Sequence, residues 1–141
     1  MKMKFGNMKM LLAFGLVTAF CINVETANAQ GKPKGTPWAA PATAVKEKNP
    51  VKADDASVQE GKELFAQHCK SCHGAKGKGD GVKAEKIDIS CGDFGSPEVQ
   101  KMTDGELYWK TTEGRKPMPS FKDKLSDNER WAVVNFLKTL K

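Results

Sequence analysis

Five consecutive residues, Cys69-Lys70-Ser71-Cys72-His73, place two thiols and an imidazole within a very short stretch of the chain. The spacing Cys-x-x-Cys-His is typical of covalent haem attachment. Each thiol can add to one vinyl group of a haem, and two intervening residues on a helical turn let both sulfurs reach the vinyl groups. The next residue then lies under the iron, where a neutral imidazole can serve as an axial ligand. The pattern therefore predicts one haem c, bound through Cys69 and Cys72, with His73 on the iron.

Two other interpretations of the cysteine pair are less well supported by the sequence. A thioredoxin-type redox pair needs a βαβ setting, which the sequence does not indicate, and a zinc site needs two further ligands nearby. The segment after His73, residues 74–81, holds four glycines, but it is not a phosphate-binding loop because its spacing differs and no strand precedes it. We expect this segment to form a tight turn that passes close to the haem.

A second axial ligand must come from elsewhere in the chain. His68 is the only other histidine, and it adjoins Cys69, so it cannot reach the opposite face of the haem. Met118 lies in a loop between two prolines, which restrict the backbone and can hold a thioether sulfur at the iron. Met102 is the alternative, but it directly precedes a helix signal and suits core filling better. The sequence thus predicts His73 and Met118 as the iron ligands.

The N-terminus has the three parts of an export signal. Three lysines (Lys2, Lys4 and Lys9) precede an uncharged, largely apolar run over residues 10–22, and Ala27-Asn28-Ala29 supplies the small residues of a cleavage site. The apolar run is shorter than the roughly 18 residues expected of a membrane-spanning helix. We therefore expect residues 1–29 to be a signal peptide and the mature protein to reach the periplasm, with an uncleaved membrane anchor as the alternative.

The composition argues against nucleic acid as a partner. The formal net charge is +6, and removal of three lysines and one glutamate with residues 1–29 lowers it by two. No aromatic-studded basic face accompanies this modest surplus, so nothing indicates nucleic-acid binding.

The segment over residues 30–56 is rich in proline, alanine and lysine, with four of the seven prolines of the chain. Such composition predicts an extended, poorly ordered linker, with Trp38 as its one large side chain on a solvated arm. Residues 57–141 remain as one small domain. A chain of this length buries a limited core, and a covalently held haem would supply a large apolar plate for it.

Three capping-box patterns predict helices in this domain, at Ser57-x-x-Glu60, Thr103-x-x-Glu106 and Ser126-x-x-Glu129. Ser96-Pro97 indicates a further short helix that ends near Met102. Val133, Phe136, Leu137 and Leu140 form an apolar stripe in the last helix. No segment alternates as a strand does, so the domain is predicted to be all-α.

These residues resemble the class I cytochrome c family over residues 57–141, and compact bacterial mono-haem members in particular. The resemblance rests on the haem motif, on Gly61 and Phe65 before it, on residues 133–138, and on Gly114-x-x-x-Met118-Pro119. It implies the class I cytochrome c fold, with helices packed around one covalently attached haem and Phe136 near Phe65. Cys91 departs from the family pattern, and we assign this odd thiol no function.

With both axial positions filled, the iron has no open position for a substrate. The expected function is therefore transfer of one electron by a periplasmic haem protein, without enzymatic activity, catalytic residues or a small-molecule substrate. Partners would be redox proteins, a donor and an acceptor, including acidic proteins or a membrane-bound oxidase or dehydrogenase. Basic residues are expected to frame the haem edge and steer such partners: Lys70, Lys76, Lys78, Arg115, Lys116, Lys122 and Lys124.

Two alternatives from other functional classes stay open. In the first, the chain is the haem subunit or domain of a dehydrogenase or oxidase complex. In the second, Met118 is only weakly bound and the haem binds a gas or peroxide at the iron.

Overall fold

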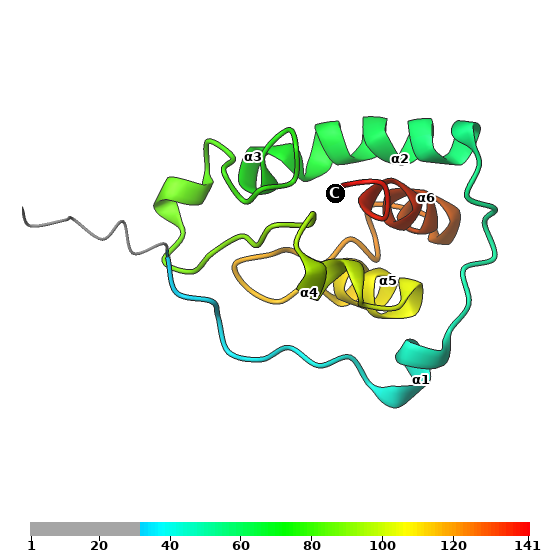
Figure 1. Cartoon of the computed structure of the whole chain (residues 1–141), viewed down its shortest axis with the longest axis horizontal. Helices are drawn as coiled ribbons and strands as arrows, with labels where there is room; N and C mark the ends of the chain where they lie inside the picture. The colour runs from blue at the N-terminus through cyan, green and yellow to red at the C-terminus, as the bar shows by residue number, and fades with distance from the viewer. Residues whose placement is uncertain (1–31) are drawn as a thin grey trace, which may run out of the picture.

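The computed structural model describes residues 32–141, and this part of the chain is helical without a β-strand (Figure 1). A single isolated bridge joins Arg115 and Met118. None of the helices within residues 32–141 has the length and apolar character needed to cross a membrane. The predicted signal peptide, residues 1–29, lies outside the described residues. The elements are α1 (Ala42–Lys46), α2 (Asp55–His68), α3 (Lys70–His73), the 3₁₀-helix η1 (Ala84–Lys86), α4 (Pro97–Gln100), α5 (Asp104–Glu113) and α6 (Asp127–Leu137).

The pair formed by α2 and α6 is the centre of the fold, and the two helices cross near Gly61 (Figure 1). A β-carbon at Gly61 would overlap the carbonyl oxygen of Ala132 and lie 3.0 Å from Cβ of Phe136. Beside this crossing the rings of Phe65 and Phe136 pack with centroids 5.2 Å apart. The expected close contact between the first and last helices of the domain is confirmed.

The capping of α2 differs from the predicted one. Ser57 is not the N-cap, because the helix begins earlier, with Asp54 as its N-cap. The carboxylate of Asp54 accepts a hydrogen bond from the Ser57 amide at 3.1 Å, and the Ser57 hydroxyl accepts one from the Asp54 amide at 3.3 Å. Aspartate caps a helix as well as serine does, so Asp54-x-x-Ser57 competes with Ser57-x-x-Glu60 for the same helix end.

The other predicted helix starts are confirmed. Capping boxes join Thr103 to Glu106 at the start of α5 and Ser126 to Glu129 at the start of α6. The hydroxyl of Ser96 accepts a hydrogen bond from the amide of Val99 at 3.4 Å, which caps α4. Local side-chain chemistry thus determines where these three helices begin.

The core consists of two clusters that share α6. Eight successive residues of that helix, numbers 130–137, are buried, so it has no solvent face over this stretch. One cluster contains Phe65, Phe121, Leu125, Val133, Phe136 and Leu137, with Met118 and Cys69 against it, and the other contains Leu107, Trp131 and Val134. Helix α6 therefore connects the first cluster, near the haem motif, to the second one on α5.

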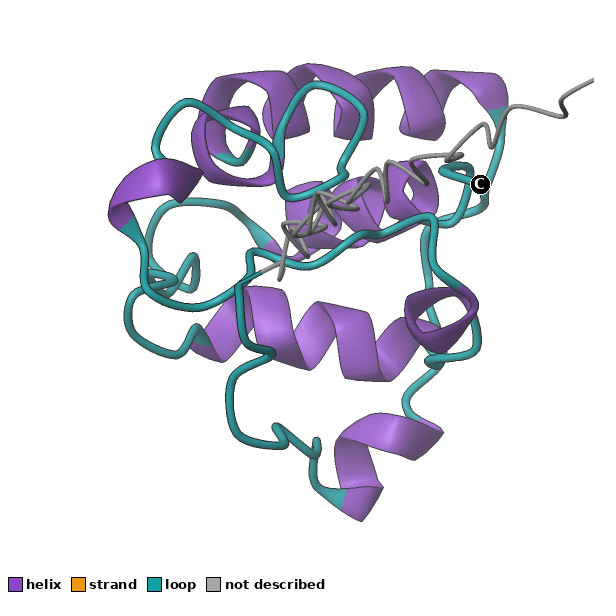
Figure 2. Cartoon of the chain, turned by 60° about the vertical axis from the view of Figure 1, so that its left-hand side comes forward, coloured by secondary structure: helices purple, strands orange, loops and turns teal. Residues whose placement is uncertain are grey.

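The described part of the predicted linker, residues 32–56, is packed against the domain and is not a poorly ordered tether. It runs along the side of the molecule away from α2 and then forms α1, which lies against α5 (Figures 1 and 2). Ala44 of α1 is buried. Asn49 donates a hydrogen bond to the side chain of Asn135 at 2.7 Å. These contacts join residues far apart in the sequence, which proline content and composition do not reveal.

Candidate haem-binding site

The haem motif lies where α2 ends and α3 begins. Cys69 is the C-cap of α2, and its amide donates a hydrogen bond to the carbonyl of Phe65 at 2.9 Å. The carbonyl of Cys69 in turn accepts hydrogen bonds from the amides of Cys72 at 3.1 Å and His73 at 3.0 Å. This tight helical turn holds the two thiols and the imidazole next to one another.

The glycine-rich segment, residues 74–81, folds back onto α3 as the predicted tight turn. The amide of Gly79 donates to the carbonyl of His73 at 2.8 Å, and the amide of Gly81 donates to that of Cys72 at 3.2 Å. These hydrogen bonds join the segment to α3, and none of its residues lines the cavity that Cys72 and His73 line.

An apolar cavity with an empty volume of ≈ 850 Å³, partly open to solvent, lies beside α3. All four residues predicted to hold the haem line it: Cys69, Cys72, His73 and Met118. The remaining walls come from segments far apart in the sequence: Trp38, His68, Ile87, Ile89, Ser90, Cys91, Gly92, Arg115, Pro117, Pro119 and Phe121.

Met118 reaches the cavity from the loop that follows α5. Its amide donates a hydrogen bond to the carbonyl of Arg115 at 2.9 Å, which closes a tight turn. Met102 lies elsewhere, against the second core cluster, with Nζ of Lys110 3.2 Å from its sulfur. Of the two methionines considered from the sequence, Met118 is therefore the one that lines the cavity with His73.

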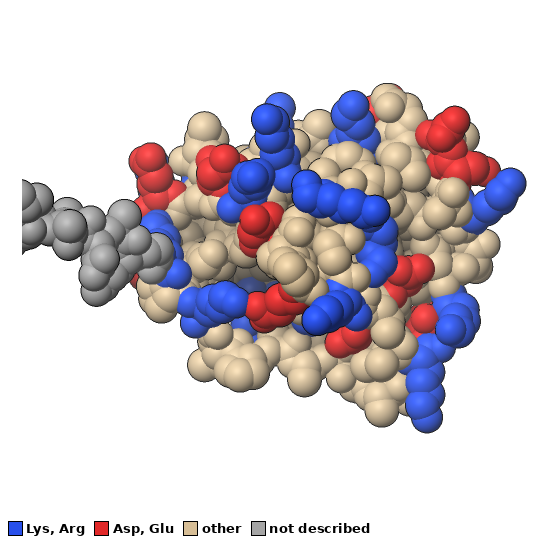
Figure 3. All heavy atoms as spheres, viewed as in Figure 1, with Lys and Arg blue, Asp and Glu red and all other residues tan. Residues whose placement is uncertain are grey.

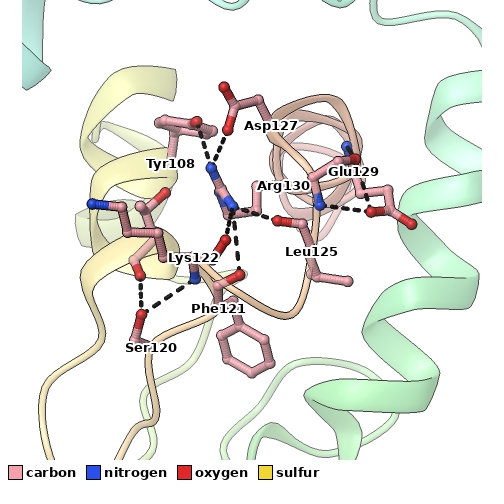
Figure 4. Close-up of polar contacts among 10 residues, drawn as sticks. Tyr108, Ser120, Phe121, Lys122, Leu125, Asp127, Glu129 and Arg130 are labelled. Carbon is pink, nitrogen blue, oxygen red and sulfur yellow. Dashed lines mark hydrogen bonds and ion pairs between the residues drawn. The ribbon is translucent and has the colours of Figure 1, made fainter.

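Arg130 anchors the chain just downstream of the methionine loop (Figure 4). Its buried guanidinium donates hydrogen bonds to the carbonyls of Phe121, Lys122 and Leu125, the second of these at 3.0 Å. It also donates to the Tyr108 hydroxyl at 3.0 Å and pairs with Asp127. One side chain of α6 thus fixes the segment that leads from the cavity to the last helix.

The surroundings of His73 favour its neutral form. Its ring lies 4.7 Å from that of Phe94, and burial lowers the pKa of the imidazole below its ordinary value. The backbone of Cys91 lies near enough to oppose this shift in part, but Nδ1 of His73 is buried without a hydrogen-bond partner. A neutral imidazole is the form that binds a metal ion.

The two motif cysteines are free thiols, and so is Cys91. Burial, together with the neighbouring Cys72, raises the pKa of Cys69 to about 12. Before a haem is attached, the Cys69 sulfur is thus a protonated thiol at neutral pH. No disulfide joins it to another cysteine in the described part of the chain.

These features fit a haem. The cavity is mainly apolar, carries two unpaired thiols at the haem-attachment spacing, and presents an imidazole with an unsatisfied buried nitrogen and a thioether. Two thiols, an imidazole and a thioether on the wall of one apolar cavity are the donor set of a haem pocket. Within residues 32–141, no three side chains of His, Cys, Asp or Glu gather as a site for a bare metal ion.

A comparison with protein families supports the assignment of this cavity as a haem site. Residues 56–137 match the family model described as cytochrome c oxidase, cbb3-type, subunit III. The chain belongs to the class I cytochrome c family. As the family implies, this cytochrome carries a haem c and serves haem-based electron transfer.

Several solved structures resemble the chain. A chain of the Kuenenia stuttgartiensis reducing HAO-like protein complex Kustc0457/Kustc0458 is 30% identical, with a TM-score of 0.57 over 64% of this cytochrome and 46% of that chain. The KustC0563 c-type cytochrome is 32% identical, with a TM-score of 0.51 over 57% of this cytochrome and 96% of that chain. The cytochrome thus spans less than half of the first of these relatives. Among curated proteins, none matches the sequence.

Several cavity residues were not identified from the sequence. Trp38, Ile89 and Cys91 line the cavity, and Phe94 packs on His73. His68, set aside as a ligand because it adjoins Cys69, also lines the cavity. The positions of Trp38, Ile89, Cys91 and Phe94 depend on how the N-terminal segment and the segment after η1 fold back over the domain, and no local sequence signal predicts that path.

Proposed function

We propose that this cytochrome is a periplasmic electron carrier whose haem is bonded to Cys69 and Cys72, with His73 and Met118 as axial ligands. One observation carries the proposal: a single apolar cavity is lined by all four side chains, although Met118 is far from the motif in the sequence. When bound, the haem supplies a one-electron ferric/ferrous couple.

Each residue has a separate task in this arrangement. The two cysteines fix the haem to the end of α2, and the buried imidazole of His73 is held neutral for the iron. The Met118 sulfur would be the second protein ligand to the iron, and substrates would then be excluded from the metal. The thioether and the apolar walls disfavour the additional positive charge of the ferric state, and they thereby raise the reduction potential.

A role within a larger complex is the second candidate. It is favoured by the similarity to a chain of the Kuenenia reducing HAO-like protein complex, of which this cytochrome covers 46%. The domain would then pass electrons to or from an enzyme in a fixed assembly instead of diffusing between partners. Isolating the native protein and identifying what purifies with it distinguishes the two candidates.

Optical spectroscopy of the purified holoprotein tests the proposed ligation. A sulfur–iron bond gives the ferric protein a weak near-red absorption band, and a reduced protein with both axial positions filled does not take up carbon monoxide readily. We also expect a reversible one-electron titration. Ready carbon monoxide binding by the unmodified protein, without the near-red band, would favour the gas- or peroxide-binding alternative.

The periplasmic location rests on residues 1–29 of the sequence. N-terminal sequencing of the haem-loaded protein from the periplasmic fraction tests it. We expect the mature chain to begin at Gln30, and a chain that begins at Met1 in the membrane fraction would indicate the uncleaved anchor.

A further inference from the structure

The segment over residues 32–41, here called the strap, runs along the side of the molecule away from α2 and leads into α1 (Figures 1 and 2). One of its residues, Trp38, lines the haem cavity. It lies outside residues 56–137, which match the family model. Its contacts are therefore an addition to the domain that the family model describes.

The strap contacts the methionine loop through Arg115. The guanidinium of Arg115 donates hydrogen bonds to the carbonyls of Thr36 at 2.9 Å and Pro37 at 3.3 Å. The carbonyl of the same residue accepts the hydrogen bond from the Met118 amide. Arg115 therefore belongs both to the tight turn that presents Met118 and to the contact with the strap.

Trp38 is the second point of contact. The guanidinium of Arg115 lies 4.8 Å from the centre of its ring, and the ring of Trp109 in α5 lies 5.8 Å away on a tilted plane. Trp38 is half-buried and lines the haem cavity. Its indole thus fills the space between α5, the methionine loop and the cavity, and its contact with Arg115 is a cation–π interaction.

Both ends of the strap are fixed to the domain. At one end, Nζ of Lys32 donates hydrogen bonds to the carbonyls of Ala84 at 2.5 Å and Ile87 at 2.6 Å, at the end of η1. At the other end, α1 lies so close to α5 that a β-carbon at Gly105 would overlap the carbonyl oxygen of Ala44. The position of Trp38 is therefore determined from both sides.

We propose that Trp38 and Arg115 are positioning residues that hold the Met118 loop closed over the haem cavity. The proposal rests on the proposed function, in which Met118 is an axial ligand. Trp38 and Arg115 make their contacts when the Met118 loop is closed, with the Met118 sulfur at the iron. These contacts therefore stabilise the closed state relative to an open state in which the sulfur has moved away from the iron. An external ligand can reach the iron only from the open state, and its apparent affinity reports the balance between the two states.

Titration of the ferric holoprotein with imidazole tests this proposal. We expect Trp38→Ala to raise the apparent imidazole affinity about tenfold, which corresponds to about 1.4 kcal/mol. We expect Arg115→Met to act in the same direction, and Trp38→Phe, which keeps an aromatic face for the guanidinium, to restore most of the wild-type value. The near-red band of the ferric protein should weaken together with the gain in imidazole affinity.

Lys34→Ala is the matched control. Lys34 belongs to the strap, but its ammonium pairs at 2.5 Å with Glu98 of α4 and not with a residue of the methionine loop, and both side chains are exposed. This variant removes a strap contact without touching Trp38 or Arg115, so we expect wild-type imidazole affinity. Haem content and far-ultraviolet circular dichroism, measured for every variant, show whether each one is folded and loaded.

The outcomes separate this inference from the proposed function. If Trp38→Ala and Arg115→Met are folded, keep the near-red band and bind imidazole as the wild type does, the strap does not position Met118 and the inference is wrong. If Lys34→Ala gives the same gain as Trp38→Ala, a general loosening of the segment explains the effect and the specific roles are wrong. If the wild type itself lacks the near-red band, the assignment of Met118 as ligand fails first.

Discussion

Gly61 and Ala132 lie in backbone contact where α2 crosses α6, because no side chain separates them. The crossing carries the haem motif, since Cys69 follows at the end of α2. The interlocked rings of Phe65 and Phe136 lie beside it. The distance between α2 and α6 therefore also determines where Cys69 lies in the wall of the haem cavity.

Changes at this crossing are expected to reduce stability. Gly61→Leu would force the helices apart, and Phe136→Ala would leave a cavity, with a loss of ~3–5 kcal/mol in the free energy of unfolding. Chemical denaturation of the holoproteins measures both losses. Val82→Ala is the control, because Val82 is 84% exposed and its truncation should change little. Wild-type unfolding curves for both core variants would contradict the close crossing.

Haem attachment is expected to require the two motif thiols and not the third. Acid–acetone extraction should leave the haem on the wild type, whereas Cys69→Ala combined with Cys72→Ala should lose it and fail to fold. Cys91→Ala removes another thiol from the wall of the same cavity and should keep its haem. Free haem extracted from the unmodified protein would show that the attachment is not covalent.

Loss of the thioether is expected to open the iron to external ligands. Met118→Ala should keep its haem, become high-spin or take up an added ligand, and show a lower reduction potential. Met102→Ala is the matched control, since that methionine packs in the second core cluster. The opposite pattern, with the changes in Met102→Ala alone, would make the ligand assignment wrong.

The Arg130 network is expected to stabilise the segment that follows the methionine loop. Arg130→Met would keep the bulk of the side chain but leave the carbonyls of Phe121, Lys122 and Leu125 without their donor. We expect a loss of roughly 3 kcal/mol in the free energy of unfolding, because unsatisfied buried acceptors cost about 1–3 kcal/mol each. Tyr108→Phe removes one hydrogen bond of the network and should cost only about 1 kcal/mol. Equal, small losses in the two variants would show that the carbonyl contacts contribute little.

Exposed lysines are expected to affect the rate of partner association. Lys70 and Lys116 are exposed, but acidic residues are interspersed with basic ones on the face shown in Figure 3. Arg115, counted among the steering residues from the sequence, is half-buried and contacts the strap. We expect Lys70→Glu and Lys116→Glu to slow electron transfer with an acidic partner at low salt and to leave the potential nearly unchanged.

The salt dependence of the wild-type rate provides the check on this electrostatic role. Raising the ionic strength to the physiological value shortens the electrostatic screening length to ~8 Å. The attraction between the lysines and an acidic partner then weakens, so the rate of electron transfer by the wild type should fall. A rate that does not change with salt would show that these lysines are solvated side chains without a role in association.

The parts of the fold that local chemistry determines could be predicted from the sequence. The capping boxes at Thr103 and Ser126, and the all-helical character of the domain, are features of this kind. The helix crossing at Gly61 was expected instead from the family resemblance. The one misplaced cap, Ser57, arose because Asp54 offers an equivalent side chain three residues earlier.

Long-range packing could not be predicted in the same way. Trp38 lies in a proline-rich segment whose composition indicates an unpacked arm, yet it lines the haem cavity. Its position depends on partners such as Trp109 and Arg115, more than 70 positions away in the sequence. Cys91 reaches the cavity because the chain after η1 passes beside α3, and this path has no local sequence signature.

The hydrogen bonds of Lys32 to the end of η1 also determine how the protein can be attached to a surface. Lys32 is fixed beside Ile87, which lines the haem cavity, so a probe attached at Lys32 would start near that wall. An electrode coupled through a short linker at this residue would therefore lie near the cavity. The packed segment thus determines where such an attachment begins, and it would set the distance over which electrons have to travel.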